Sequence, residues 1–230
     1  MRVIVLDTET TGVPQKGASI YETEKYPYII QISWAIYDDE EKRVIEEKDY
    51  IISLSKNVEI TQESINIHGI TREISEMKGV SIREALFDLN VAFRSCNMMV
   101  AHNLSFDKRM VIVESKRNRI YINFPEKEYC TMKNSVNVCK IPIVLANGDN
   151  VYKFPKLVEL YKYLYNTDET PENMHNSMVD VNICMKCYAA LIELPPAPYT
   201  PYYKREPTTP HGEPVITVNT QEEAGDDSSV

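Results

Sequence analysis

The sequence lacks any run of 18 consecutive apolar residues. A helix that spans a bilayer needs about that length, so we expect no membrane-spanning segment and no membrane partner. The first ten residues, MRVIVLDTET, reach an acid at position 7 and contain no small-residue cleavage site, so we expect no signal peptide. Five cysteines are an odd number for a disulfide framework and favour a reducing compartment. We therefore expect an intracellular protein of the cytoplasm or nucleus.

Positive charge is also in short supply. The chain has 25 Lys and Arg against 34 Asp and Glu, a formal net charge of -9 and a pI of about 5.1. A protein that coats long nucleic acid needs many phosphate contacts, and this balance argues against that class. It is still compatible with an enzyme that grips one chain end through a few local contacts.

The composition divides the chain into two parts. Residues 1–194 are hydrophobic enough to bury a substantial core and are expected to form one domain, without an internal repeat. Residues 195–230 hold seven of the 13 prolines and end in EEAGDDSSV. This second part cannot bury a core, so we expect a Pro-rich, acidic, disordered tail that could tether the domain to a polymerase or other protein.

The apolar patterns predict an α/β fold with a sheet of mixed strand direction. Strands are expected at residues 3–6, 28–37, 43–52 and 98–101, with DDEEK as a hairpin turn between the second and third. Helices are expected from a capping box at Ser81, over about 105–117, over 155–166 and over 177–194.

Asp7 and Glu9 follow directly after the apolar run VIVL. Side chains two apart in a strand point to the same face, so these carboxylates should lie side by side and repel each other. A divalent cation between them would convert the repulsion into binding. Two solvated acids at a strand end are the alternative, but ligands of α/β sheets bind at the carboxyl ends of strands, which favours a site.

Two further segments place acids at helix starts. In VAHNLSFD, Asp107 falls in the first turn after a short strand, where the helix dipole alone would favour it, with Asn103 or Ser105 as a cap. In HNSMVD, His175 and Asp180 are five apart, about 140° around a helix, and do not share a face. We expect His175 to precede the helix and reach back over its start; a loose capping box is the alternative for Ser177–Asp180.

Together these segments, in the order DTE, HN…D and H-x-x-x-x-D, resemble the DnaQ-like 3′–5′ exonucleases of the DEDDh type, which have a ribonuclease H-like fold. IIQIS, ESINIHGIT, VAHNLSFD and HNSMVDVNI also resemble this family in its usual order, over most of residues 3–194. The resemblance implies a central mixed five-stranded sheet flanked by helices. One departure is Asn176-Ser177-Met178, where the family more often has an alanine-leucine pair.

The resemblance implies two divalent ions, Mg²⁺ or Mn²⁺, in one site. Asp7 would bridge them, Glu9 and Asp180 would help to hold one, and Asp107 would support the site directly or through water. Two such ions can stabilise the attacking and leaving oxygens of a phosphoryl displacement. His175 is the expected general base, because an imidazole exchanges protons near working pH.

Contacts to the substrate follow from the same resemblance. Thr10 and Thr11 are expected near the terminal 3′-hydroxyl, and His68 and Phe106 around the terminal nucleotide, where an aromatic ring can stack on any base. A turn residue for His68 and core packing for Phe106 are the alternatives.

Two other patterns are set apart from the site. The basic run at Lys116, Arg117 and Arg119 is expected to be a solvated face, with a phosphate contact as the alternative. Cys184 and Cys187 form a CxxC without a second pair, and we expect a buried helix face rather than zinc.

Three functions compete. The first is a metal-dependent exonuclease that releases nucleoside 5′-monophosphates from single-stranded 3′ ends of DNA, in proofreading or repair. The second is an RNA-trimming 3′–5′ exoribonuclease, since the choice depends on contacts to the 2′-hydroxyl. The third is a binding module that has lost catalysis; it is disfavoured because all four acids and His175 are present.

Overall fold

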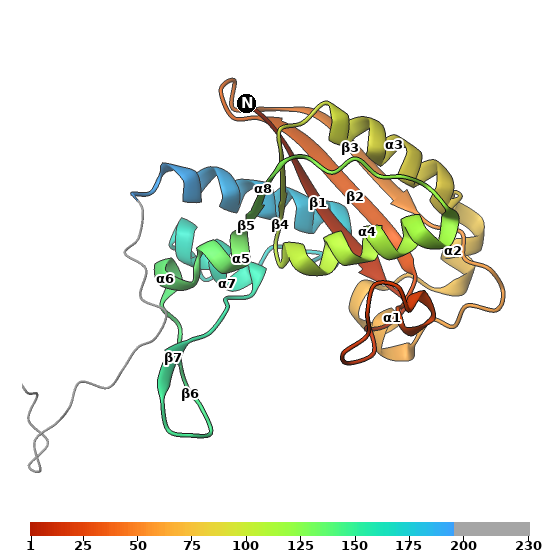
Figure 1. The fold of residues 1–230 in the computed structure, drawn as a ribbon. Helices are drawn as coiled ribbons and strands as arrows, with labels where there is room; N and C mark the ends of the chain where they lie inside the picture. The colour runs from red at the N-terminus through yellow and green to blue at the C-terminus, as the bar shows by residue number, and fades with distance from the viewer. Residues whose placement is uncertain (196–230) are drawn as a thin grey trace, which may run out of the picture.

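Five strands form one mixed sheet in the order β3-β2-β1-β4-β5 (Figure 1). The computed structural model describes residues 1–195. The strands are β1 (Arg2–Thr10), β2 (Ile29–Asp38), β3 (Arg43–Ile51), β4 (Met98–Ala101) and β5 (Lys127–Cys130). β1 pairs antiparallel with β2 and parallel with β4, and β5 is parallel to β4. The predicted mixed five-stranded sheet of the ribonuclease H-like class is confirmed.

β1 is central because its first residues are apolar on both faces. Val3, Ile4, Val5 and Leu6 are all fully buried. Ile4 and Leu6 join the core beneath α3 (Ile82–Arg94) and α4 (Leu104–Asn118). Val3 and Val5 join a second core beneath α7 (Leu157–Tyr165) and α8 (Ser177–Glu193). Helices therefore cover both faces of the sheet, as Figure 1 shows.

The first strand is longer than its apolar run suggested. It continues through the acids to Thr10, because residues 7–9 still pair with β2, with Asp7 opposite Ser33 and Glu9 opposite Gln31. The register shifts only between Glu9 and Thr10. The two acids are thus held by strand pairing rather than standing in a loop.

The long helices start close to their expected positions. Ser81 caps α3 by accepting a hydrogen bond from the amide of Arg83, as its capping position predicted. Lys156, not Pro155, is the residue before α7, and Asn176 rather than Ser177 caps α8.

Several short elements were not expected from the sequence. They are η1 (Thr23–Lys25), α1 (Gln62–His68), α2 (Arg72–Lys78), α5 (Thr131–Asn134), α6 (Val136–Cys139) and the hairpin strands β6 (Pro142–Val144) and β7 (Asn150–Tyr152). None exceeds seven residues, too few for a clear apolar period. The caps of α1 and α2 are Thr61 and Thr71.

The basic run at the end of α4 is solvated at Lys116 and Arg119, as the sequence suggested, but not at Arg117. The Arg117 side chain is only 11% exposed and pairs with buried Glu114 at 2.8 Å. Its Nη1 donates to the carbonyl of Pro27 at 2.8 Å, and its guanidinium lies 3.9 Å from the ring centroid of Tyr28. Arg117 therefore fixes the segment that leads into β2, and it is not free to bind phosphate.

Cys184 and Cys187 are 1% and 0% exposed, which confirms that they lie on a buried face of α8. No helix among residues 1–195 combines the length and the apolar character needed to cross a bilayer. The predicted disordered tail lies, apart from Pro195, outside the described residues.

We predict that Arg117→Gln lowers the free energy of unfolding by about 3 kcal/mol, because it leaves the buried Glu114 carboxylate without its partner. Urea denaturation measures this change. Arg119→Gln is the matched control: Arg119 is exposed, and its loss should change stability by less than about 0.5 kcal/mol. Equal losses in both variants would show that Arg117 has no special structural role.

Candidate active site

Asp7 and Glu9 lie on the face of the sheet that α8 covers. Alternation along β1 puts them in line with Val3 and Val5, which pack against α7 and α8. Both acids keep part of their surface in solvent. The strand therefore presents two carboxylates next to each other at an accessible end of a buried sheet.

Asp107 comes from the first turn of α4 and is only 2% exposed. Thr8, which points to the opposite face from Asp7 and Glu9, donates a hydrogen bond from its Oγ1 to Asp107 Oδ1 at 2.8 Å. Asn103 precedes the helix in the left-handed region, with φ of 70°, and its side chain forms no cap. Asparagine tolerates this conformation better than most residues.

α8 begins on top of β1 because Ser177 anchors it there. The hydroxyl of Ser177 donates to the carbonyl oxygen of Asp7 at 2.7 Å, and its amide donates to Gln31 Oε1 at 3.2 Å. Gln31 in turn donates from Nε2 to Asp49 Oδ1 at 2.8 Å. Ser177 lies in the segment Asn176-Ser177-Met178 that departs from the usual family pattern, and here it joins the helix to the strand that carries the acids.

Asp180 projects from the first turn of α8 and is 7% exposed. Its Oδ2 accepts a hydrogen bond from the backbone amide of His175 at 3.3 Å. Its Oδ1 is buried and has no hydrogen-bond partner among the described residues. His175 itself is exposed, precedes the helix as expected and has φ of 67°. This left-handed turn brings the residue back over the start of α8.

Burial raises the pKa values of all four carboxyl groups, and neighbouring acids add to the shift in Asp7, Glu9 and Asp107. Burial is the main cause that raises the pKa of Glu9 to about 8, of Asp107 to about 7 and of Asp180 to about 6. Burial, and then the charges of Asp107, Asp180 and Glu9, raise the pKa of Asp7 well above its usual range. All four acids therefore hold protons more tightly than isolated carboxyl groups. A cluster of carboxylates that binds a cation is expected to behave in this way when the cation is absent.

The residues present fit a divalent metal. Ligand atoms of Glu9, His175 and Asp180 all lie within 4.8 Å of one another. The unpartnered Oδ1 of Asp180 is a buried acceptor that a cation would satisfy. Carboxylate oxygens dominate this set, and hard divalent cations prefer such ligands.

The expected substrate contacts lie in different environments. Thr10 and Thr11 are buried, and their hydroxyls already bond within the protein: Thr10 Oγ1 donates to Gly12 O at 2.7 Å, and Thr11 Oγ1 accepts from the amide of Tyr28 at 3.0 Å.

Phe106 is partly buried and packs against the core. His68 ends α1, its Nδ1 accepts from the amide of Ile70 at 3.0 Å, and its Nε2 has no partner among the described residues. Their contact with a nucleotide stays a prediction.

The sequence reading missed Thr8, Gln31 and Ser177 as supports of the site. Thr8 could have been found from strand alternation, because it must face away from Asp7 and Glu9. Gln31 was visible as the polar residue inside the apolar stretch IIQIS, and such a buried side chain needs partners. The role of Ser177 depends on which strand α8 covers, which no local pattern contains.

Comparison with known proteins decides the family. The RNase_T family model, described as "Exonuclease", matches residues 4–188. This chain belongs to the exonuclease family, in its DnaQ-like DEDDh group. It is 25% identical, over 195 residues, to the DNA polymerase III subunit epsilon of Salmonella typhimurium, covering 83% of this chain and 71% of that protein.

Solved structures show the same fold. The nuclease domain of 3′hExo, a DEDDh family member bound to rAMP, has a TM-score of 0.61 at 12% identity, over 89% of this chain and 97% of that one. Exonuclease I of E. coli in complex with a dT13 oligonucleotide has a TM-score of 0.61 at 15% identity; the match covers 84% of this chain but only 41% of Exonuclease I. A zinc-bound form of its complex with single-stranded DNA has a TM-score of 0.60 at 16% identity.

For this exonuclease we predict that the metal-free fold loses stability as the pH rises toward about 8. The folded carboxyls have raised pKa values, so the fold binds protons that the unfolded chain has released. Each such proton contributes a slope of about -1.4 kcal/mol per pH unit. His68 and His102, whose pKa values burial lowers, act in the opposite direction only below about pH 7.

Urea denaturation in EDTA, at about pH 7 and about pH 8.5, measures the slope. A saturating divalent cation should reduce it, leaving the smaller part that the buried cysteines contribute, since burial raises their pKa values as well. The same cation should raise the melting temperature of the wild type more than that of Asp7→Ala. A pH-independent metal-free protein, or equal shifts in both proteins, would contradict a cation site at these acids.

We also predict that Gln31→Leu weakens divalent-cation binding. The substitution orphans the buried amide of Ser177, costs about 1–3 kcal/mol of stability and loosens the helix that carries Asp180. Ser33→Ala is the control, because the Ser33 hydroxyl also bonds Asp49 Oδ1, at 2.8 Å, but is not the group that accepts the Ser177 amide. Calorimetric titration should show weaker cation binding in Gln31→Leu alone; unchanged binding there would remove Gln31 from the support of the site.

Proposed function

We propose that this chain is a metal-dependent 3′–5′ exonuclease that hydrolyses phosphodiester bonds at single-stranded 3′ ends of DNA and releases nucleoside 5′-monophosphates. The observation that supports this most directly is the convergence of Glu9, His175 and Asp180 within 4.8 Å, beside Asp7 and the buried Asp107. A module that only binds would have no need for four acids with raised pKa values around a histidine.

In this proposal Asp7, Glu9, Asp107 and Asp180 hold two Mg²⁺ or Mn²⁺ ions. When bound, such ions supply charge stabilisation for the attacking and leaving oxygens of an in-line displacement. The protein contributes fixed positions: strand pairing holds Asp7 and Glu9, Thr8 holds Asp107, and the start of α8 holds Asp180.

His175 is the proposed general base. It is exposed, so water can reach its ring, and its ring lies beside the carboxylates of Glu9 and Asp180. Neighbouring carboxylates would stabilise the imidazolium that forms when the ring accepts a proton. The left-handed backbone conformation of His175 directs its ring toward these carboxylates, at some cost in backbone strain.

The strand enters by its 3′ end in this proposal. Thr10 and Thr11 lie near the terminal hydroxyl, chiefly through the backbone since their side-chain oxygens are engaged, and His68 and Phe106 flank the terminal nucleotide.

DNA is the first choice of substrate because the curated relative is a DNA polymerase subunit and Exonuclease I is solved with oligodeoxythymidylate. The structure of 3′hExo with rAMP supports the RNA-trimming alternative. Proofreading or repair is the proposed role, with the chain divided into a catalytic domain, residues 1–194, and a tail that contacts a polymerase or other protein.

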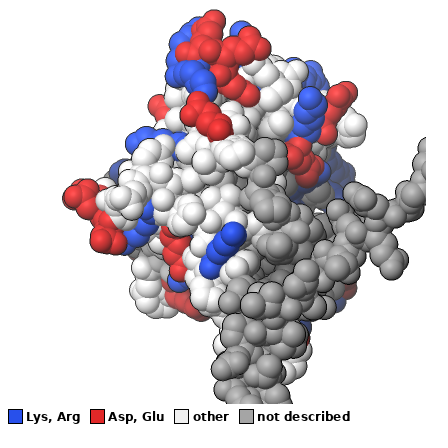
Figure 2. All heavy atoms as spheres, turned by 90° about the vertical axis from the view of Figure 1, so that its left-hand side faces the viewer, with Lys and Arg blue, Asp and Glu red and all other residues white. Residues whose placement is uncertain are grey.

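The charges on one face of the molecule suit a short footprint. Figure 2 shows one face on which acidic and basic side chains alternate around a largely uncharged centre, without a continuous basic track in the part that is coloured. A long phosphate track would need such a band.

The test uses the purified protein with Mg²⁺ or Mn²⁺ and matched DNA and RNA oligonucleotides. A 5′-labelled single strand should give a descending ladder, and a 3′-labelled strand should release labelled mononucleotide at once. A 3′-phosphate should inhibit and a 5′-phosphate should not. Cutting of a circular single strand at a comparable rate would show an endonuclease instead, and faster cutting of RNA would select the alternative substrate.

We predict that His175→Ala lowers kcat by roughly 10²- to 10⁴-fold while cation binding persists, the usual effect of losing a positioned base. Raising the pH should rescue the variant in part, because hydroxide becomes more available. Single-turnover kinetics across pH measure both effects. A variant with wild-type kcat at neutral pH would remove His175 from the reaction.

A further inference from the structure

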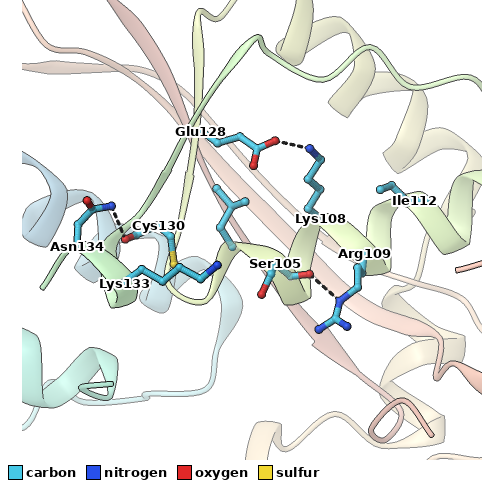
Figure 3. A pocket seen from close by; sticks show the side chains of 9 residues that line it. Ser105, Lys108, Arg109, Ile112, Glu128, Cys130, Lys133 and Asn134 are labelled. Atoms are coloured by element: carbon cyan, nitrogen blue, oxygen red, sulfur yellow. Dashed lines mark hydrogen bonds and ion pairs between the residues drawn. The ribbon is translucent and has the colours of Figure 1, made fainter. Parts of the chain in front are cut away.

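A hollow of about 630 Å³ opens between the first turns of α4, the end of β5 and α5 (Figure 3). Its floor includes the apolar side chains of Leu104 and Ile112, and three basic residues, Lys108, Arg109 and Lys133, line it. Hollows of this size bind small organic ligands in other proteins. The combination of an apolar floor and cations suits a group with a flat apolar part and an anionic part.

The cations outnumber the acids in this hollow, in contrast to the chain as a whole. Glu128 is the one acid among the lining residues, and it pairs with Lys108. Arg109 uses its Nε to bond the carbonyl of Ser105 at 2.9 Å, and no described carboxylate pairs with its guanidinium. Lys133 is exposed and forms no ion pair within residues 1–195. Two cations are therefore available to an anionic ligand.

The hollow lies on the outer side of the helical turn that carries Asp107 on its inner side. Ser105 and Arg109 line the hollow, and Asp107 lies midway between them in the sequence, less than one turn from each. In Figure 3 Lys133 extends from α5 toward this turn of α4. A strand with its 3′ end at the acids would reach the hollow by crossing the start of α4.

We propose that this hollow binds a phosphodiester of the substrate strand upstream of the 3′ terminus, with Lys133 and Arg109 on the phosphate and the sugar or base on Leu104 and Ile112. The inference rests on the proposed exonuclease function and adds a second contact region to it. Arginine and lysine are the side chains that hold phosphate in this way. The chain as a whole is acidic, so a local excess of positive charge is a favourable place for it to bind nucleic acid.

The experiment separates this contact from the chemistry by substrate length. One substrate is the p-nitrophenyl ester of thymidine 5′-monophosphate, which is too short to reach the hollow. The others are oligothymidylates of increasing length, starting from the dinucleotide. Lys133→Gln and the double variant Lys133→Gln/Arg109→Gln are compared with wild type and with Lys42→Gln, which loses an exposed lysine in the β2–β3 turn at the other end of the sheet.

The expected result is a deficit that grows with length. The ratio of wild-type to Lys133→Gln kcat/KM should stay within about twofold for the ester and reach about fivefold for long oligothymidylates, carried by KM. The slope of log kcat/KM against log salt should weaken by about 0.7 in Lys133→Gln and by about 1.4 in the double variant. Lys42→Gln should match wild type throughout.

Three results would overturn the proposal: wild-type salt slopes in both variants, an equal deficit on the ester, or the same change in Lys42→Gln. The hollow would belong to a small anion instead of the strand if two results came together. Free thymidine 5′-monophosphate or inorganic phosphate would bind wild type more tightly than the double variant, and the kcat/KM deficit of the variants would not depend on substrate length. If wild type cleaves neither the ester nor the oligonucleotides, the proposed function fails. The hollow is then judged by fluorescence anisotropy of labelled oligothymidylate, where a wild-type salt slope in the double variant would overturn it.

Discussion

The repulsion among four carboxylates at one end of the sheet is the constraint on which the rest of the structure depends. Asp7, Glu9, Asp107 and Asp180 come from three separate elements, and each has a raised pKa. Left to themselves, such groups would move apart or into water. The fold must therefore hold each acid by contacts that do not involve the other three.

Each acid has its own means of attachment. Asp7 and Glu9 are fixed by strand pairing that continues from four fully buried residues. Asp107 accepts the hydroxyl of Thr8, and Asp180 is placed by the helix that Ser177 joins to β1. Asp107 and Asp180 also lie in first turns of helices, where the dipole favours negative charge. The dipoles lower the cost of the cluster without neutralising it, so the acids still favour a proton or a cation.

The sequence was sufficient for the parts of the site that depend on local periodicity. Strand alternation placed Asp7 beside Glu9, and helix starts placed Asp107 and Asp180. It was insufficient where partners are distant: the Ser177–Asp7 bond joins residues 170 positions apart, and the Arg117–Pro27 bond joins residues 90 apart. A basic run looks the same in sequence whether its arginine is solvated or buried on backbone carbonyls. Short helices such as α1 and α2 were not predicted, because one or two turns hold too few apolar residues to define a period.

The same carboxylates that would hold the metal also oppose the substrate. Without a cation, those acids that have lost their protons repel the phosphates of any strand that approaches, and the net charge of -9 adds to this repulsion at low salt. In the proposed exonuclease a cation removes the local part of the repulsion, so it must strengthen binding of the strand. Linkage is reciprocal, so the strand must strengthen binding of the cation by the same factor. The positive hollow beside α4 lies outside this coupling, because its lysine and arginine keep their charge whether or not the acids are neutralised. An acidic protein can thus hold nucleic acid through two regions, one that depends on the metal and one that does not.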